Sequence, residues 1–168
     1  MKVLTFKIDD RERLGFLSAD EKWIYTTESI GMEYRNMKEL IRGISESEIQ
    51  LAEYVASKPP YETETVRAIP LEDARILAPI PEPDQDIICL GVNYASHLEE
   101  SREFLNDAYE KEQSWPVYFG KRVDRAWADN DEISSYPDLV DGLDYEAELA
   151  VILSKDARNV SESQVKDY

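Results

Sequence analysis

Two glutamates near the end of the sequence, Glu146 and Glu148, have the residue type and spacing that most favour a metal-binding site. They lie in the segment Leu143–Leu153, where side chains alternate with the period of two that is typical of a β-strand. Residues two apart on a strand share a face, with Cα atoms about 6.5–7 Å apart, so both carboxylates can converge on one hard cation. A bound Mg²⁺ or Mn²⁺ would also offset the cost of placing charge among apolar neighbours. The alternative is an exposed strand face with ordinary surface acids.

The second candidate is His97, the one histidine of the chain. It follows an apolar run that ends at Gly91, within residues 94–104 that we predict to begin a helix. Glu100 lies three residues further on, so on a helix its carboxylate would stand beside the imidazole. A carboxylate on one ring nitrogen fixes the tautomer and raises the basicity of the other, as a general base requires. The alternative is a surface helix on which His97 and Glu100 are neighbours by chance.

Two further sets of polar residues are weaker candidates. Lys121 follows the predicted strand Pro116–Phe119 and could meet a substrate carboxylate, although it also suits an ordinary surface position. Acidic residues cluster shortly after it, but they lack the glycine and the terminal glutamate of a calcium-binding loop. We predict a solvated loop there; its acids are Asp124, Asp129, Asp131 and Glu132.

The first seventy residues predict a small unit with strands followed by helices. Alternation favours strands at 4–8, 13–17 and 23–25, with a turn at Asp9 and Asp10. Apolar residues at helical spacing then predict a helix from Met37 to Ile44, broken near Gly43. The string 45–48 has capping-box spacing and predicts a second helix that runs through Ala56 and ends before two prolines.

The prolines at 70, 79, 81 and 83 predict an extended linker, because proline cannot donate to a sheet. We therefore expect one domain over residues 1–70 and a second over residues 79–168. Strands are predicted in the second domain at 86–92, 116–119 and 143–153, and its acidic loop covers residues 124–131.

Composition limits the possible partners. Acidic residues outnumber basic ones 36 to 19, and the net charge of −17 argues against nucleic acid and anionic membrane surfaces. Cys89 is the only cysteine, so no disulfide can form within the chain, and its apolar neighbours predict a small buried side chain. The sequence has neither a signal-peptide core at its start nor an apolar run of membrane-spanning length, and we expect a cytoplasmic protein.

Taken in order, three stretches resemble the fumarylacetoacetate hydrolase family. They are residues 81–100 with the string Asn93-Tyr94-Ala95-Ser96-His97, residues 116–121, and residues 143–152 with the string Asp144-Tyr145-Glu146-Ala147-Glu148-Leu149-Ala150. The resemblance covers about residues 79–168, and its strings are specific enough to disfavour the two surface alternatives above. Residues 1–70 correspond only to the variable N-terminal domain that many members carry.

The resemblance implies an α+β chain, with a small N-terminal α/β domain followed by a mixed β-roll catalytic domain, in an enzyme that is usually a dimer. It implies Mg²⁺ or Mn²⁺ held by Glu146 and Glu148, and His97 with Glu100 as a catalytic dyad. It further implies Tyr94 and Lys121 as residues that contact the substrate, a small 2-keto or 2,4-diketo acid.

The sequence departs from the family pattern in two respects. The family's third metal ligand is an aspartate in a downstream Asn-Asp-x-x-x-Arg-Asp string, which has no counterpart before Tyr168; the later substrate-binding lysine and the loop rich in glycine and threonine are also missing. We therefore expect a catalytic domain truncated at its C-terminus, in which the apolar side chains of 143–153 cannot all be buried. Arg122 stands where relatives often have proline, which weakens the assignment of Lys121.

The leading hypothesis is a metal-dependent hydrolase that cleaves a carbon–carbon bond in acylpyruvates or other 2,4-diketo acids. The same residues without an attacking water would suit a 2-hydroxy-2,4-dienedioate isomerase or an oxaloacetate-type decarboxylase. A non-catalytic acidic interaction module is the alternative from another class of protein.

Overall fold

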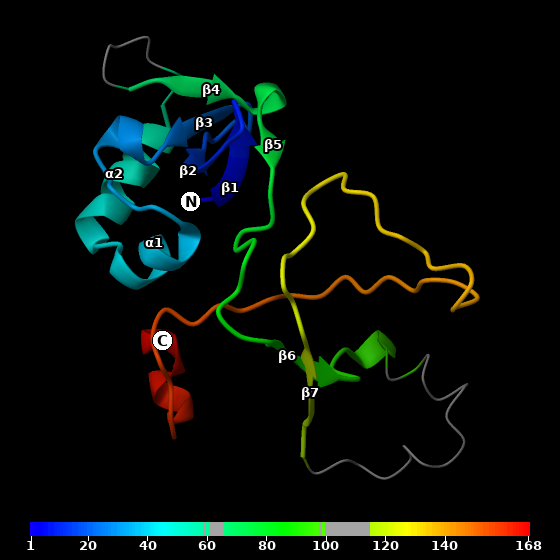
Figure 1. The fold of residues 1–168 in the computed structure, drawn as a ribbon. Coiled ribbons are helices and arrows are strands. Elements are labelled where there is room, and N and C mark those ends of the chain that lie inside the picture. Colours follow the sequence, from blue (N-terminus) through cyan, green and yellow to red (C-terminus); the bar gives the residue numbers. More distant parts are fainter. Residues whose placement is uncertain (59, 61–65, 98, 100–114) are drawn as a thin grey trace. The chain divides into compact units, whose positions relative to one another are not determined.

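The computed structural model describes residues 1–58, 60, 66–97, 99 and 115–168 (Figure 1). These residues form two compact units. The first comprises Met1–Ile80 together with Trp127–Tyr168, and the second comprises Pro81–Ala126.

The first unit is built on a five-stranded antiparallel sheet with strand order β4-β3-β2-β1-β5. β1 and β2 form a hairpin whose two turn residues, Asp9 and Asp10, have left-handed φ angles of 49° and 60°. Two-residue hairpin turns with this backbone match the natural twist of the strands. The strands are β1 (Val3–Ile8), β2 (Arg11–Leu17), β3 (Trp23–Thr26), β4 (Ala68–Pro70) and β5 (Arg75–Ile76). The structure confirms the three strands predicted before residue 26.

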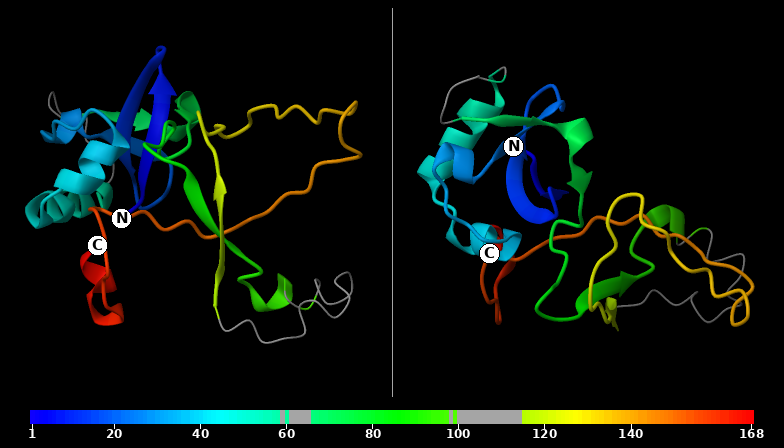
Figure 2. Two further views of the ribbon diagram at one scale, coloured as in Figure 1. Left: turned by 60° about the horizontal axis from the view of Figure 1, so that its bottom comes forward. Right: turned by 45° about the horizontal axis from the view of Figure 1, so that its top comes forward.

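Two helices, α1 (Met37–Gly43) and α2 (Glu46–Ala56), pack on one face of this sheet, as the two views of Figure 2 show. Strand alternation directs Leu14 and Phe16 of β2 toward the helices, where they join Met37, Leu40 and Ala52 in the core. The opposite face is also buried in the curl of the sheet. Phe6 and Ile24 have no exposed surface there. The fold is therefore mixed α/β with a curled antiparallel sheet.

Gly15 of β2 allows this curl, because a side chain there would strike its neighbours. A Cβ atom at position 15 would overlap Cγ2 of Ile24 and lie 3.0 Å from the carbonyl oxygen of Tyr25. We expect Gly15→Ala to destabilise the first unit by about 1–3 kcal/mol, the usual cost of overpacking. Thermal unfolding measures the effect. Gly120→Ala is the control, since a Cβ there meets nothing within 4 Å, and equal losses in both variants would contradict the prediction.

The capping box predicted at the start of α2 is present. The Ser45 hydroxyl accepts from the Glu48 amide, and the Glu48 carboxylate accepts from the Ser45 amide at 2.8 Å. Tyr34 also donates its hydroxyl to Glu48 at 3.0 Å. The Ser45 hydroxyl, then the Ser45 amide and the Tyr34 hydroxyl, hold the pKa of Glu48 below its ordinary value.

This lowered pKa makes the stability of the first unit depend on pH. Because the folded pKa of Glu48 lies below the unfolded one, its contribution is present above an ordinary glutamate pKa and is lost as the pH falls through the folded value. We expect the loss of melting temperature caused by Glu48→Gln to shrink between about pH 7 and about pH 3. Glu46→Gln, in the same helical turn, is the control. A loss that stays the same at both pH values would contradict the prediction.

The prediction of a linker from Pro70 onward is wrong for residues up to 76. Pro70 ends β4, which pairs with β3, and Arg75 and Ile76 form β5, which pairs with β1. Both are edge strands, where a proline without an amide donor is tolerated. The domain limits predicted at 70 and 79 remain predictions.

The short helices of this unit are η1 (Glu28–Ile30), η2 (Leu71–Asp73) and η3 (Glu162–Asp167).

The second unit contains a two-stranded antiparallel sheet of β6 (Ile87–Gly91) and β7 (Val117–Lys121), which confirms the two strands predicted there. Ile87 pairs with Lys121, and Gly91 pairs with Val117. Large apolar side chains of this sheet are exposed, including Ile88 at 72% and Tyr118 at 64%. Among the described residues of this unit no hydrophobic side chain is fully buried, and two strands alone are only marginally stable in water.

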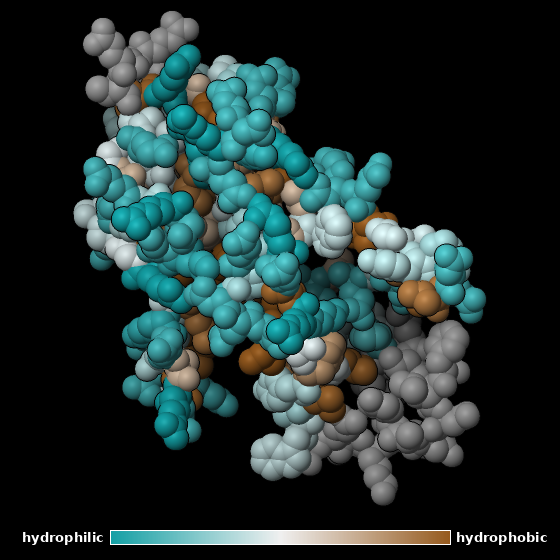
Figure 3. Space-filling model, in the orientation of Figure 1, coloured by the Kyte–Doolittle hydropathy of each residue, from teal (hydrophilic) through white to brown (hydrophobic). Residues whose placement is uncertain are grey.

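The strand predicted at 143–153 is not formed. A strand requires backbone partners, and within the described residues no strand pairs with this segment. Its apolar side chains are exposed, which confirms that they are not all buried; they are Leu143, Tyr145, Leu149, Val151, Ile152 and Leu153. The face drawn in Figure 3 is nevertheless mostly hydrophilic, in agreement with the acid-rich composition. No described helix combines the length and the apolar character that a bilayer crossing needs.

Candidate functional site

His97 lies just beyond β6, where the chain turns into a helix. Val92 has a left-handed φ of 48° directly after the strand, and residues 95–97 and 99 are helical. The side chains of Tyr94 and His97 are both exposed, so water and a small molecule can reach them. Glu100, the predicted partner of His97, lies outside the described residues. The helix predicted to begin after Asn93 is confirmed at its start.

Lys121 lies at the other end of the β6–β7 ladder from the His97 helix. The ladder pairs Lys121 with Ile87, whereas the helix follows Gly91, four residues along β6. At about 3.4 Å per residue, this separates the two ends by roughly 13–14 Å. The Lys121 ammonium lies 5.8 Å from the centre of the Phe119 ring. The strand register therefore does not bring Lys121 beside Tyr94 and His97, and its role stays a prediction.

Glu146 and Glu148 belong to the first unit, on the exposed segment that follows residue 142. Both residues are exposed, and their backbone is irregular rather than a paired strand. No group of three or more histidine, cysteine, aspartate or glutamate side chains in the described ranges is arranged to hold a metal ion. The glutamates nevertheless supply oxygen donors of the kind that Mg²⁺ and Mn²⁺ prefer, and solvent reaches them, so the pair suits part of a ligand set.

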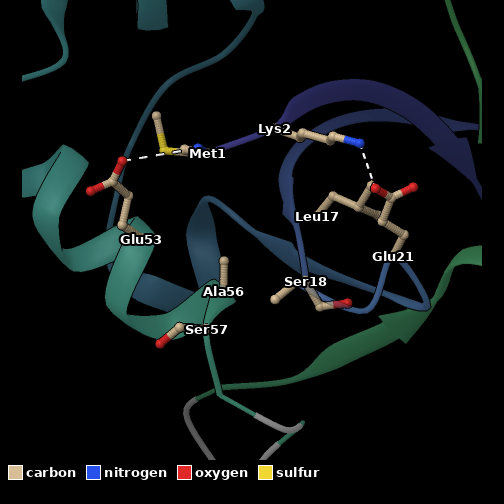
Figure 4. Close-up of a pocket in the computed structure, with 9 residues that line it drawn as sticks. Met1, Lys2, Leu17, Ser18, Glu21, Glu53, Ala56 and Ser57 are labelled. Atoms are coloured by element: carbon tan, nitrogen blue, oxygen red, sulfur yellow. Dashed lines mark hydrogen bonds and ion pairs between the residues drawn. The ribbon is translucent and has the colours of Figure 1, made fainter.

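One pocket of about 340 Å³ lies in the first unit, and none of its lining residues is a predicted site residue (Figure 4). It lies between the N-terminus, the end of β2 and the last turn of α2. Its charged groups are already paired: Lys2 donates to Glu21 at 2.5 Å, and the Met1 amine lies 3.9 Å from Glu53. Because each of these charged groups already has a partner of opposite sign, the pocket is a poor candidate for binding a charged substrate.

Sequence reasoning missed one polar residue with a defined structural role. The sequence predicts a solvated loop around Asp131, but its side chain is only 20% exposed and accepts hydrogen bonds from Arg75 and from the Ala128 amide. A run of acidic residues carries no signal that separates an anchoring carboxylate from its solvated neighbours.

A family match covers the segments that hold the predicted site residues. The sequence profile described as "Fumarylacetoacetate (FAA) hydrolase C-terminal" matches residues 86–168, which include His97, Lys121 and both glutamates. A fumarylacetoacetate hydrolase domain-containing protein 2 homolog of Dictyostelium discoideum is 42% identical over 102 residues, which are 61% of this chain and 30% of that protein.

Two bacterial proteins extend the comparison. The oxaloacetate tautomerase YisK of Bacillus subtilis is 31% identical over 162 residues, which are 96% of this chain and 51% of that protein. The homoprotocatechuate catabolism bifunctional isomerase/decarboxylase of Escherichia coli is 34% identical over 110 residues, which are 66% of this chain and 24% of that protein. The chain thus spans about half of the length of one of these relatives and less than a third of the other two. The profile match and the related sequences establish that this chain belongs to the fumarylacetoacetate hydrolase family.

Proposed function

We propose that this chain is the part of a divalent-metal-dependent enzyme that carries two metal ligands and the general base for chemistry on small 2-keto acids. The observation that carries the proposal is that the family match over residues 86–168 contains both the paired glutamates and the helix histidine. An exposed histidine at a strand-to-helix turn and two exposed carboxylates two residues apart suit these roles chemically.

Glu146 and Glu148 would hold Mg²⁺ or Mn²⁺ through their carboxylate oxygens. When bound, the cation would supply positive charge that stabilises an enolate oxygen and orients the 2-keto carboxylate. Tyr94 and Lys121 would contact the substrate. The β-roll architecture and a homodimer belong to the same proposal and rest on the family resemblance.

His97 would act as the general base in the first candidate reaction, hydrolysis of an acylpyruvate or another 2,4-diketo acid. An imidazole nitrogen of His97, oriented by Glu100, would take a proton from water. The resulting hydroxide would attack the carbonyl carbon distal to the 2-keto acid. The carbon–carbon bond then breaks, its electron pair forms the enolate of the 2-keto acid, and the other product is a carboxylic acid.

The relatives support a second candidate, in which no water attacks and only a proton or carbon dioxide is transferred. The alignment with the oxaloacetate tautomerase covers 96% of this chain and therefore includes the N-terminal unit as well as the matched region. The Escherichia coli relative is named as an isomerase/decarboxylase. All these reactions pass through an enolate next to a carboxylate, so the same residues would serve each of them.

A substrate panel separates these candidates. The full-length protein would be assayed with acylpyruvates, oxaloacetate and 2-hydroxy-2,4-dienedioates, with Mg²⁺ and with EDTA. Equal amounts of pyruvate and a carboxylic acid would identify a hydrolase. Faster loss of the enol of oxaloacetate without release of carbon dioxide would identify a tautomerase. Turnover that survives EDTA would overturn the metal requirement, and absence of both turnover and Mn²⁺ binding would leave the non-catalytic acidic module.

A further inference from the structure

Residues 127–131 follow β7 in sequence but contact β5 of the N-terminal sheet. The Asp129 amide donates to the Ile76 carbonyl oxygen at 3.3 Å, and the Arg75 guanidinium donates to the Asp131 carboxylate. Asp129 contacts Ile76, and the later residue Asp131 contacts the earlier residue Arg75. The two segments therefore run in opposite directions, as in antiparallel pairing. The segment therefore lies along the outer edge of β5.

This segment is held in a tight turn by Asp131. The Asp131 amide donates to the Ala128 carbonyl oxygen at 3.2 Å, and the Asp131 carboxylate accepts from the Ala128 amide at 2.8 Å. Asn130, inside the turn, has a left-handed φ of 60°, which asparagine tolerates better than most residues. One half-buried carboxylate thus closes the turn and also binds β5 through Arg75.

We propose that residues 127–131 form a latch that covers the open edge of β5, and that Asp131 fastens it. β5 is the last strand in the order β4-β3-β2-β1-β5, and an edge strand exposes backbone groups that can pair with other chains. The Asp129 amide of the latch donates to the Ile76 carbonyl oxygen on this outer edge. It joins the N-terminal sheet to a segment more than fifty residues later in the sequence.

The contacts of the Asp131 carboxylate with Arg75 and with the Ala128 amide are expected to differ in strength. The Arg75 side chain is 55% exposed, and exposed ion pairs contribute little to stability. The bond from the Ala128 amide closes the turn itself, and a carboxylate acceptor makes such a bond stronger than a neutral one does. Removal of the Asp131 carboxylate should therefore open the latch more than removal of the Arg75 guanidinium.

Hydrogen exchange of the 168-residue chain tests the latch residue by residue. In Asp131→Ala we expect the amides of Ala128 and Asp129 to exchange about tenfold faster, and in Arg75→Ala about twofold faster. Glu132→Ala is the matched control, because it removes an exposed neighbouring acid and should leave both rates unchanged.

A second pair of variants tests the turn without altering charge. Asn130→Val, with a β-branched side chain at a left-handed φ, should raise the same two exchange rates, and Asn130→Gly should not. Circular dichroism would check that each variant retains the cooperative melt of the sheet. Exchange in Asp131→Ala and Asn130→Val at the rates of Glu132→Ala would overturn the latch.

Discussion

Replacement of either Glu146 or Glu148 by glutamine is expected to weaken Mn²⁺ binding by at least about 100-fold, because residues that merely support a metal ligand already cost about 10–100-fold when they are changed. A neutral amide oxygen donates weakly to a hard cation, and each carboxylate also supplies a negative charge. The loss should therefore appear in each single variant. Isothermal titration calorimetry of the full-length protein with Mn²⁺ measures it.

The control for this experiment is Glu162→Gln. Glu162 is an exposed acid at the start of η3 that belongs to no predicted site, so its loss should leave Mn²⁺ affinity unchanged. If all three variants bind Mn²⁺ as the unaltered protein does, the glutamate pair is not the metal site. If all three weaken binding equally, the ion is attracted by the net charge of −17 and has no specific ligands.

Turnover of the full-length protein is expected to fall by about 10²–10⁴-fold in His97→Ala, the usual range for loss of a general base. The Michaelis constant should change little, because the proposed metal site and not the imidazole binds the 2-keto acid. Steady-state kinetics on the best substrate of the panel separate kcat from KM. The loss in Glu100→Gln should be smaller, since Glu100 acts only by orienting the base.

Ser96→Ala is the matched control for His97→Ala, because Ser96 is the preceding exposed residue on the same helix and has no assigned role. Equal losses in both variants would indicate that the turn, and not the imidazole, supports activity. Full activity in His97→Ala would exclude His97 as the base and would favour a reaction that uses another proton acceptor.

Local signals in the sequence predicted the elements of the N-terminal unit well. The Ser45–Glu48 capping box, the alternation in β1 and β2 and the helical spacing from Met37 each act within a few residues, so they can be recognised without knowledge of the fold. The edge strands β4 and β5 were missed for the opposite reason. β4 has three residues and β5 has two, which are too few to show the alternation of a strand. Pro70 also suggested a linker.

The candidate site was predicted from motifs rather than from physical pattern alone. The alternation in 143–153 predicted a strand, but a strand exists only where another backbone pairs with it, and the pairing partner cannot be identified from alternation. The contacts of Asp131 with Arg75 and Ala128 were not predicted because they join distant or backbone groups. The family strings containing His97 and the two glutamates carried the functional prediction.

The positions of the three tryptophans make this chain suitable for fluorescence spectroscopy. Trp23 is half-buried in β3, whereas Trp115 before β7 and Trp127 at the start of the latch are 80% and 62% exposed. Acrylamide should therefore quench most of the emission of the unaltered chain. A variant with Trp115→Phe and Trp127→Phe retains only Trp23, which reports on the sheet. A variant with Trp115→Phe and Trp23→Phe retains only Trp127, which reports on the latch. Opening of the latch and unfolding of the sheet then become two separate optical signals.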